Sequence, residues 1–173
     1  MSRLREGLID VLGQFRGLIL TVEQASSMDL RLYGEIGIGR HVRHVVDHLR
    51  QFERGLETGV IDYNRRKRAC ALEFDPETGL KELERLMLQM QTVPVADESV
   101  TVISEVCSLR RLDVRLTSTV QRELLFLQQH SLHHLAYAAL LARHHGVAHD
   151  PGIGIAPATA TWLRGQQECP AEG

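Results

Sequence analysis

The chain has 173 residues, of which 43% are hydrophobic and 24% are charged, which is typical of one globular domain that can bury its own core. Its formal net charge is −2 and acidic and basic residues are interleaved, which argues against nucleic acid as a partner. No apolar run approaches the ~20 residues that a membrane span needs, and the N-terminus lacks the apolar segment of a signal peptide. The three cysteines are scattered and odd in number, which suits free thiols in a reducing compartment. We expect a single cytoplasmic domain over residues 1–173 with no membrane partner.

The first 59 residues predict two helices joined by a connector. Apolar residues recur at helical spacing from Leu4 to Val22 and predict the first helix. Glycines and short polar residues from Glu23 to Gly37 predict a connector without an element of its own. A second helix is expected from Gly39 to Gly59, where the glycine suits a left-handed C-terminal cap.

The middle of the chain predicts a polar loop, a third helix and a β-hairpin. The loop runs from Val60 to Phe74. Asp75 and Pro76 form an N-cap signature for a helix that Pro94 ends. Two β-prone runs, Ser99–Val106 and Leu112–Thr117, predict a small hairpin.

A fourth helix is expected from Ser118, which forms a capping box with Gln121, to about His145. The tail predicts at most a short helix around Thr159–Leu163. Amphipathic helices bury their apolar stripes by packing together, so the sequence predicts a mainly all-α four-helix bundle with a small β-hairpin before the fourth helix. The expected core includes Leu12, Phe15, Val45, Leu49, Phe52, Leu83, Met87, Leu125 and Leu135.

Two of the nine histidines, His130 and His134, lie four residues apart on the predicted fourth helix, so both can reach one metal ion. Their neighbours on the helical projection are largely apolar: Phe126, Leu127, Tyr137 and Leu141. Two imidazoles buried there without partners would be costly, and a metal ion on one nitrogen of each removes much of that cost. Glu123 lies on the same face and is a candidate outer partner.

The predicted second helix offers His41, His44 and His48 as a third ligand. Spacing does not choose among them, and the helical projection slightly favours His48 because it lies nearer the apolar stripe.

Residues 38–47 read IGRHVRHVVD, and residues 122–134 read RELLFLQQHSLHH. Together they resemble the DinB-like (DinB/YfiT) superfamily, whose pattern is His, two small or apolar residues and Asp on the second helix, then HxxxH on the fourth. Matched residue by residue, the resemblance implies metal ligands at His44, His130 and His134. It also implies an up-down-down-up four-helix bundle with the metal between helices two and four, and a homodimer.

The same resemblance implies a metal-dependent enzyme that acts on a small molecule. The leading expectation is transfer of a low-molecular-weight thiol of the bacillithiol, mycothiol or glutathione type. The alternatives are a metal-dependent hydrolase and a non-catalytic, metal-stabilised helical bundle. Three histidines suit one divalent ion, which could be zinc, nickel or iron. The fourth helix is apolar on nearly every side, so either the first helix and the tail or a second subunit must cover it.

Other chemistry-bearing residues allow two interpretations each. The basic run Arg65–Arg68 could hold the carboxylates of a thiol cosubstrate or could form a solvated loop. Asp47 could orient a ligand imidazole or could be an exposed helix charge, and His133 could serve as a base or lie on the surface. Cys70 has no neighbour that would activate it. The cluster of His144, His145 and His149 suits the C-terminal end of a helix dipole.

Overall fold

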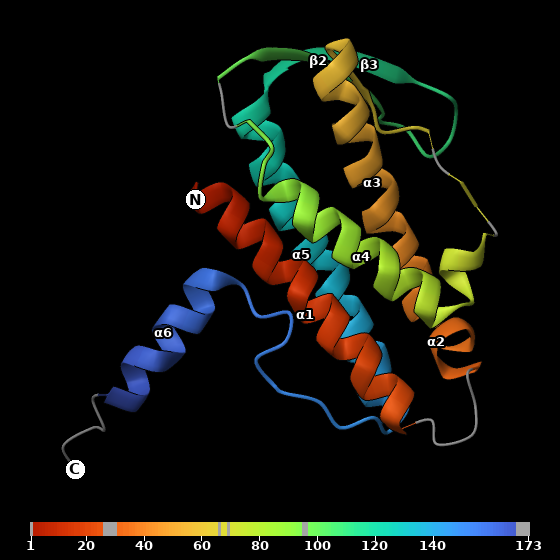
Figure 1. The fold of residues 1–173 in the computed structure, drawn as a ribbon, viewed down its shortest axis with the longest axis vertical. Coiled ribbons are helices and arrows are strands. Elements are labelled where there is room, and N and C mark those ends of the chain that lie inside the picture. The colour runs from red at the N-terminus through yellow and green to blue at the C-terminus, as the bar shows by residue number, and fades with distance from the viewer. Residues whose placement is uncertain (1, 26–30, 66, 69, 95–96, 169–173) are drawn as a thin grey trace.

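The computed structural model describes residues 2–25, 31–65, 67–68, 70–94 and 97–168. Within these residues the fold is mainly helical, as predicted, with a small sheet at one end (Figure 1). The four long helices are α1 (Arg3–Ala25), α3 (Ile38–Thr58), α4 (Pro76–Met90) and α5 (Val120–His144). Shorter elements are α2 (Arg31–Glu35), the 3-10 helix η1 (Ala71–Glu73) and α6 (Pro157–Glu168). No helix in the described part of the chain is both long and apolar enough to cross a membrane.

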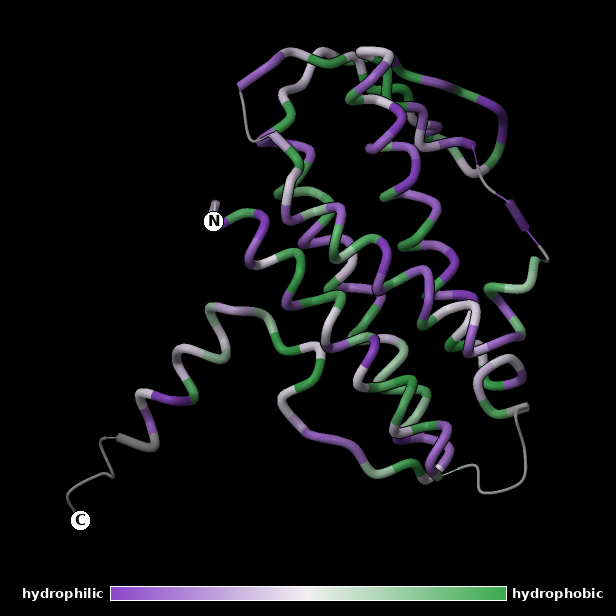
Figure 2. The backbone as a smooth tube through the Cα atoms, viewed as in Figure 1, coloured by the Kyte–Doolittle hydropathy of each residue, from purple (hydrophilic) through white to green (hydrophobic). Residues whose placement is uncertain are grey.

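The long helices pack around one hydrophobic core, α1 against α4 and α5, and α3 against the same two helices. The apolar stretches of the tube in Figure 2 alternate with polar ones along these helices, as expected where one face is buried. Seven of the nine predicted core residues are fully buried: Leu12, Phe15, Val45, Leu49, Phe52, Leu83 and Leu135. Met87 is only half-buried against that core. The prediction for Leu125 is wrong, because this side chain is 40% exposed and faces a hollow lined by Ala156 and Pro157 of the tail.

The sheet has the strand order β1-β2-β3. Strands β2 (Ser99–Glu105) and β3 (Asp113–Thr119) pair antiparallel where the sequence predicted a hairpin. Strand β1 (Val60–Asp62) pairs parallel with β2, and the prediction of a loop there is wrong because three residues are too few to show alternation. Ile61 of β1 is buried against Gly55 of α3, where an added Cβ would lie 2.2 Å from the Ile61 Cγ1. This contact holds the sheet against α3.

Three boundaries differ from the predicted ones. The predicted connector contains α2, whose fully buried Tyr33 donates a hydrogen bond to the Leu72 carbonyl at 2.8 Å. The N-cap of α5 is Thr119 rather than Ser118, because the Thr119 side chain accepts from the Arg122 N–H. Helix α6 is longer than the predicted tail helix and begins at Pro157, a residue suited to the first helical position. The predicted left-handed cap at Gly59 is confirmed, with φ 71°.

Candidate metal centre

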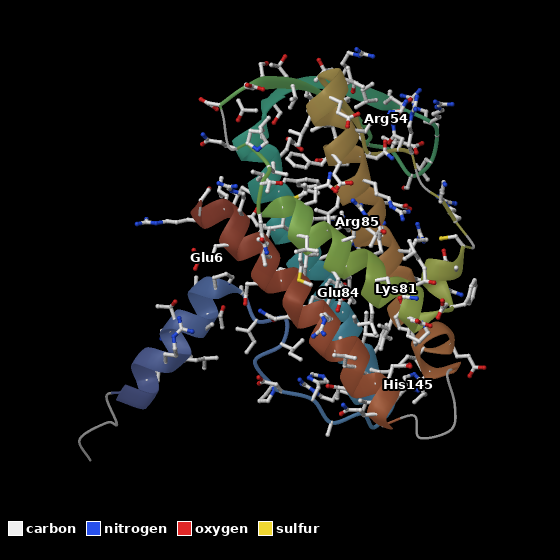
Figure 3. All side chains as sticks on the ribbon, in the orientation of Figure 1. Glu6, Arg54, Lys81, Glu84, Arg85 and His145 are labelled. Carbon is white, nitrogen blue, oxygen red and sulfur yellow. The ribbon has the colours of Figure 1, made fainter. Side chains whose placement is uncertain are left out.

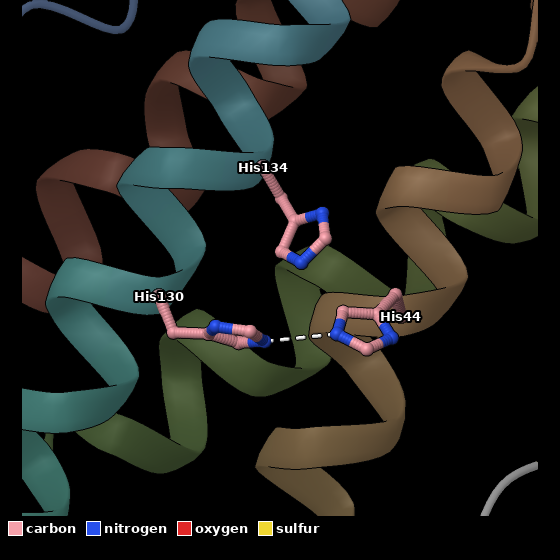
Figure 4. Close-up of side chains that lie close together, drawn as sticks. All are labelled: His44, His130 and His134. Carbon is pink, nitrogen blue, oxygen red and sulfur yellow. Dashed lines mark hydrogen bonds between the residues drawn. The ribbon is translucent and has the colours of Figure 1, made fainter. Parts of the chain in front are cut away.

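Three histidines from two helices converge between α3 and α5 (Figure 4). His44 comes from α3, whereas His130 and His134 lie one turn apart on α5. One ring nitrogen of each lies within 4.8 Å of those of the other two, and all three residues are half-buried. Among the described residues, this is the cluster of histidine, cysteine and acidic side chains whose geometry fits a metal ion. The structure therefore brings together the three residues that the sequence proposed as ligands.

Within the cluster, the Nε2 atoms of His44 and His130 are 2.8 Å apart. Two nitrogens at ~2.05 Å from one tetrahedral zinc ion lie about 3.3 Å from each other. The two rings need to separate by only about half an ångström to share an ion, a small adjustment of side-chain torsions. Their hydrogen bond occupies the nitrogens that a metal ion would use.

His41, which the sequence offered as a possible third ligand, is instead a hydrogen-bond partner of the cluster. Its Nδ1 lies 2.9 Å from the Nδ1 of His134, and one of these two nitrogens donates to the other. This bond occupies the side of the His134 ring that faces His41, and Figure 4 shows the other nitrogen of His134 directed toward His44 and His130. The His41 ring also stacks on Tyr137, with an interplanar angle of 5°. His41 is thereby placed to orient a ligand, as outer hydrogen-bond partners do in metal sites.

His48, which the helical projection favoured, has a different position. It is 5% exposed, and its Nδ1 donates to the His44 carbonyl of the preceding turn at 2.9 Å. Its ring stacks on Tyr63, with centroids 5.0 Å apart. The His48 ring also lies against His130, with centroids 4.5 Å apart. Among the described residues, however, the group whose ring nitrogens all lie within 4.8 Å of one another contains His44 and not His48.

Burial sets the protonation state of the cluster. Desolvation lowers the pKa of His134 to about 3, and the neighbouring histidines His130 and His41 add to the shift. Desolvation also lowers the pKa of His41, with a further contribution from His133. Both rings are neutral at physiological pH, and neutral imidazole is the form that binds a metal ion.

The two buried carboxylates near the cluster do not contact its rings. Asp47 pairs with the Arg43 Nη1 at 2.9 Å and accepts from the Lys67 N–H at 3.2 Å, so it fastens the loop after β1 to α3. Burial raises the pKa of Asp47, and its hydrogen bond with Arg43 opposes this shift. Glu123 accepts from the Tyr63 hydroxyl at 2.8 Å and from the Ser118 hydroxyl at 2.6 Å. The predicted outer partner thus hydrogen-bonds Tyr63, whose ring contacts Phe126, and Phe126 in turn stacks on His130; Tyr63 lies in the segment predicted as a loop.

The described residues of the predicted basic run lie away from the cluster. Arg65 pairs with Asp62 and, with Lys67, lines a separate hollow of about 630 Å³ beside Arg50 and Arg54 of α3. Figure 3 shows Arg54 near the end of α3 that adjoins the sheet. Arg66 of the predicted basic run lies outside the described residues.

Among the predicted histidine and cysteine candidates, His133 is exposed beside His134, with ring centroids 5.4 Å apart. His149 lies against the last turns of α5, where its Nε2 donates to the Ala139 carbonyl. The Cys70 thiol lies near the Lys67 carbonyl, outside the histidine cluster.

Comparison of the chain with protein-family models, with curated proteins and with solved structures found no match.

Proposed function

We propose that the chain is a DinB-like metal-dependent enzyme in which His44, His130 and His134 hold one divalent ion, zinc, nickel or iron. The observation that carries the proposal is the convergence of one nitrogen from each of these side chains within 4.8 Å. Two helices supply them, so the site depends on the packing of α3 against α5. In the same proposal the four long helices form an up-down-down-up bundle with the ion between α3 and α5.

The surroundings of the cluster favour a catalytic site over a structural one. Structural zinc sites are closed by four protein ligands, whereas catalytic sites keep a position for water or substrate. Neither His48 nor Glu123, the two residues that could close the site, belongs to the group of described residues whose ligand atoms lie within 4.8 Å of one another, and Glu123 is held by Tyr63 and Ser118. This arrangement supports the enzyme over the non-catalytic metal-stabilised bundle.

We infer that the reaction is transfer of a low-molecular-weight thiol to an electrophilic small molecule, with hydrolysis as the second candidate. An ion held by three neutral imidazoles keeps its full charge and, when bound, lowers the pKa of a coordinated thiol or water toward neutrality. The role of the protein is to hold its imidazoles neutral and in fixed orientations. Burial keeps the His134 ring neutral, and its hydrogen bond with His41 fixes the orientation of the ring.

The test is a rate measurement with glutathione, cysteine and bacillithiol against chlorodinitrobenzene as a generic electrophile. It compares the metal-loaded protein, the chelated protein and His130→Ala. We expect turnover that needs both thiol and metal. Hydrolysis of an activated ester that needs metal but no thiol would move the assignment to hydrolase. Equal rates in all three samples in both assays would contradict a metal-dependent enzyme.

We also propose that the chain forms a homodimer through α5 and α6. Several large apolar side chains of these helices are exposed, and Figure 1 shows α6 projecting away from the other helices. Large apolar side chains exposed on these two helices can be buried by a second copy of the chain. The residues concerned are Leu125, Tyr137, Leu140, Trp162 and Leu163.

A further inference from the structure

A pocket of about 330 Å³ lies between the sheet and the first turns of α5. Its apolar wall consists of Val102 and Leu116 from the sheet and Phe126 from α5. Its polar wall includes Tyr63 and Glu123. The volume suits a small molecule, and a mostly apolar lining with a few placed polar groups is typical of ligand sites.

The Glu123 carboxylate is the most informative group in this pocket. It is only 5% exposed, and each oxygen accepts from a neutral hydroxyl, that of Tyr63 or that of Ser118. Burial raises the pKa of Tyr63, and the charge of Glu123 raises it further, so the phenol stays protonated and remains the donor. Among the described residues, Glu123 forms no ion pair. A buried carboxylate that has only neutral hydrogen-bond partners can bind a cation, although the N-terminus of α5, in whose first turn Glu123 lies, already stabilises part of its charge.

The one cationic side chain among the lining residues, Arg122, forms no ion pair with Glu123 in the described part of the chain. It is exposed, and its Cζ lies over the Phe126 ring at 5.9 Å from the centroid. The charge of Arg122 acts on Tyr63, where it opposes the upward pKa shift, but no described cationic side chain pairs with the Glu123 carboxylate, which can still pair with a cation that enters the pocket. The carboxylate oxygens retain acceptor capacity for it, because an ionised carboxylate has about four lone-pair sites.

Two ring contacts connect this pocket to the candidate metal centre. Phe126 stacks on His130, with centroids 5.2 Å apart and an interplanar angle of 16°. Tyr63 stacks on His48, which donates to the His44 carbonyl. Glu123 and His130 are seven residues apart on one face of α5, which places them about 10 Å apart along the helix axis. None of the three histidines of the cluster is among the lining residues, so a substrate held in the pocket must extend past the Phe126 ring to reach them.

We propose that this pocket binds the non-reacting part of the substrate, and that the substrate carries an apolar, ring-sized body next to a protonated amine. The body packs against Leu116 and Phe126, and the ammonium group binds Glu123. The assignment of this ligand as a substrate rests on the proposed function, whereas the binding itself needs no metal ion.

The test uses three probes of similar shape and different charge: benzylamine, benzyl alcohol and benzoate. Their affinities are measured by protein NMR titration at neutral pH with metal-free protein and again with metal-loaded protein. We expect benzylamine to bind at least tenfold more tightly than benzyl alcohol, and benzoate to bind most weakly, in both forms. Glu123→Gln should abolish the preference for the amine, whereas Glu84→Gln, a surface substitution on α4, should retain it.

A second variant keeps the test informative if Glu123→Gln fails to fold. Leu116 is 58% exposed and lines the pocket, so Leu116→Trp should fold and should weaken all three probes at least fivefold while the order of affinities stays the same. Equal binding of the three probes to the native protein, or no binding, overturns the inference even if the protein holds a metal ion. An amine preference in protein that binds no metal supports the pocket and contradicts only the proposed metal centre.

Discussion

His41 on α3 and His134 on α5 form a hydrogen bond between their Nδ1 atoms, which lie 2.9 Å apart. The bond couples a proposed metal ligand to the opposite helix and occupies the Nδ1 face of its ring. If His134 binds an ion through its other nitrogen, His41 fixes the tautomer and the ring orientation that binding requires.

Replacement of His41 should therefore weaken metal binding without removing a ligand. We expect His41→Ala to raise the dissociation constant for zinc about 10- to 100-fold, the usual effect of losing an outer hydrogen-bond partner. His133→Ala is the matched control, because its ring lies near His134 but is exposed. Competition with a chromophoric chelator measures both affinities. An equal effect of the two substitutions would show that His41 has no specific role.

The metal-free protein should lose stability as the pH falls. The folded-state pKa values of His134 and His41 lie below the ordinary value of 6.5 because of burial. Below about pH 6.5 the unfolded chain takes up protons that the folded chain does not, so the free energy of unfolding decreases as the solution is acidified. For His134 this decrease continues toward its folded pKa of about 3.

Urea midpoints of the chelated protein at pH 7.5 and pH 5.0 measure this dependence. His134→Gln should show a smaller difference between the two midpoints than the native protein, because glutamine does not titrate. A difference of the same size in the variant would assign the acid sensitivity to other groups.

The close packing of α3 against the backbone of Glu73 should require glycine at position 39. An added Cβ there would lie 2.2 Å from the Glu73 carbonyl oxygen, which belongs to backbone and cannot move freely. We expect Gly39→Ala to destabilise the fold by about 1–3 kcal/mol through overpacking. Gly13→Ala in α1, where a Cβ meets nothing within 4 Å, should instead be neutral or stabilise by up to about 1 kcal/mol. Chemical denaturation of both variants distinguishes the two effects, and similar stability of the two would contradict the contact.

The proposed homodimer depends on apolar residues of α5 and α6. Light scattering at micromolar concentration should give twice the 19.5 kDa chain mass. Leu140→Glu should shift the protein toward monomer because it places a charge in the proposed interface. Leu88→Glu is the matched control, since Leu88 is similarly exposed but lies on α4. A native protein that stays monomeric at every concentration measured would contradict the proposed dimer.

The long helices could be predicted from the sequence because each repeats its apolar pattern over several turns. Strand β1 and helix α2 could not, because three and five residues are too short to show a period. Ile61 and Tyr33 are buried by contacts with α3 and η1, which exist only after the chain has folded.

The candidate site was partly predictable for the same reason. The spacing of His130 and His134 placed both on one face of α5, but spacing on α3 could not choose among three histidines. His44 was selected by the resemblance, and the structure places it beside His130. The roles of His41 and Tyr63 follow from packing between elements distant in sequence, which no local pattern reveals.

Metal content is the measurement that tests the central claim most directly. The native protein is purified without a tag or a nickel column and analysed for zinc, nickel and iron. The same analysis is made on four variants: His44→Ala, His130→Ala, His134→Ala and His48→Ala. Circular dichroism checks the helical content of each variant. The account predicts about one ion per native chain, loss of the ion in the first three variants and its retention in His48→Ala. A native protein that binds no divalent ion after incubation with each metal, or a His44→Ala variant that keeps full occupancy while His48→Ala loses it, would contradict the proposed ligand set.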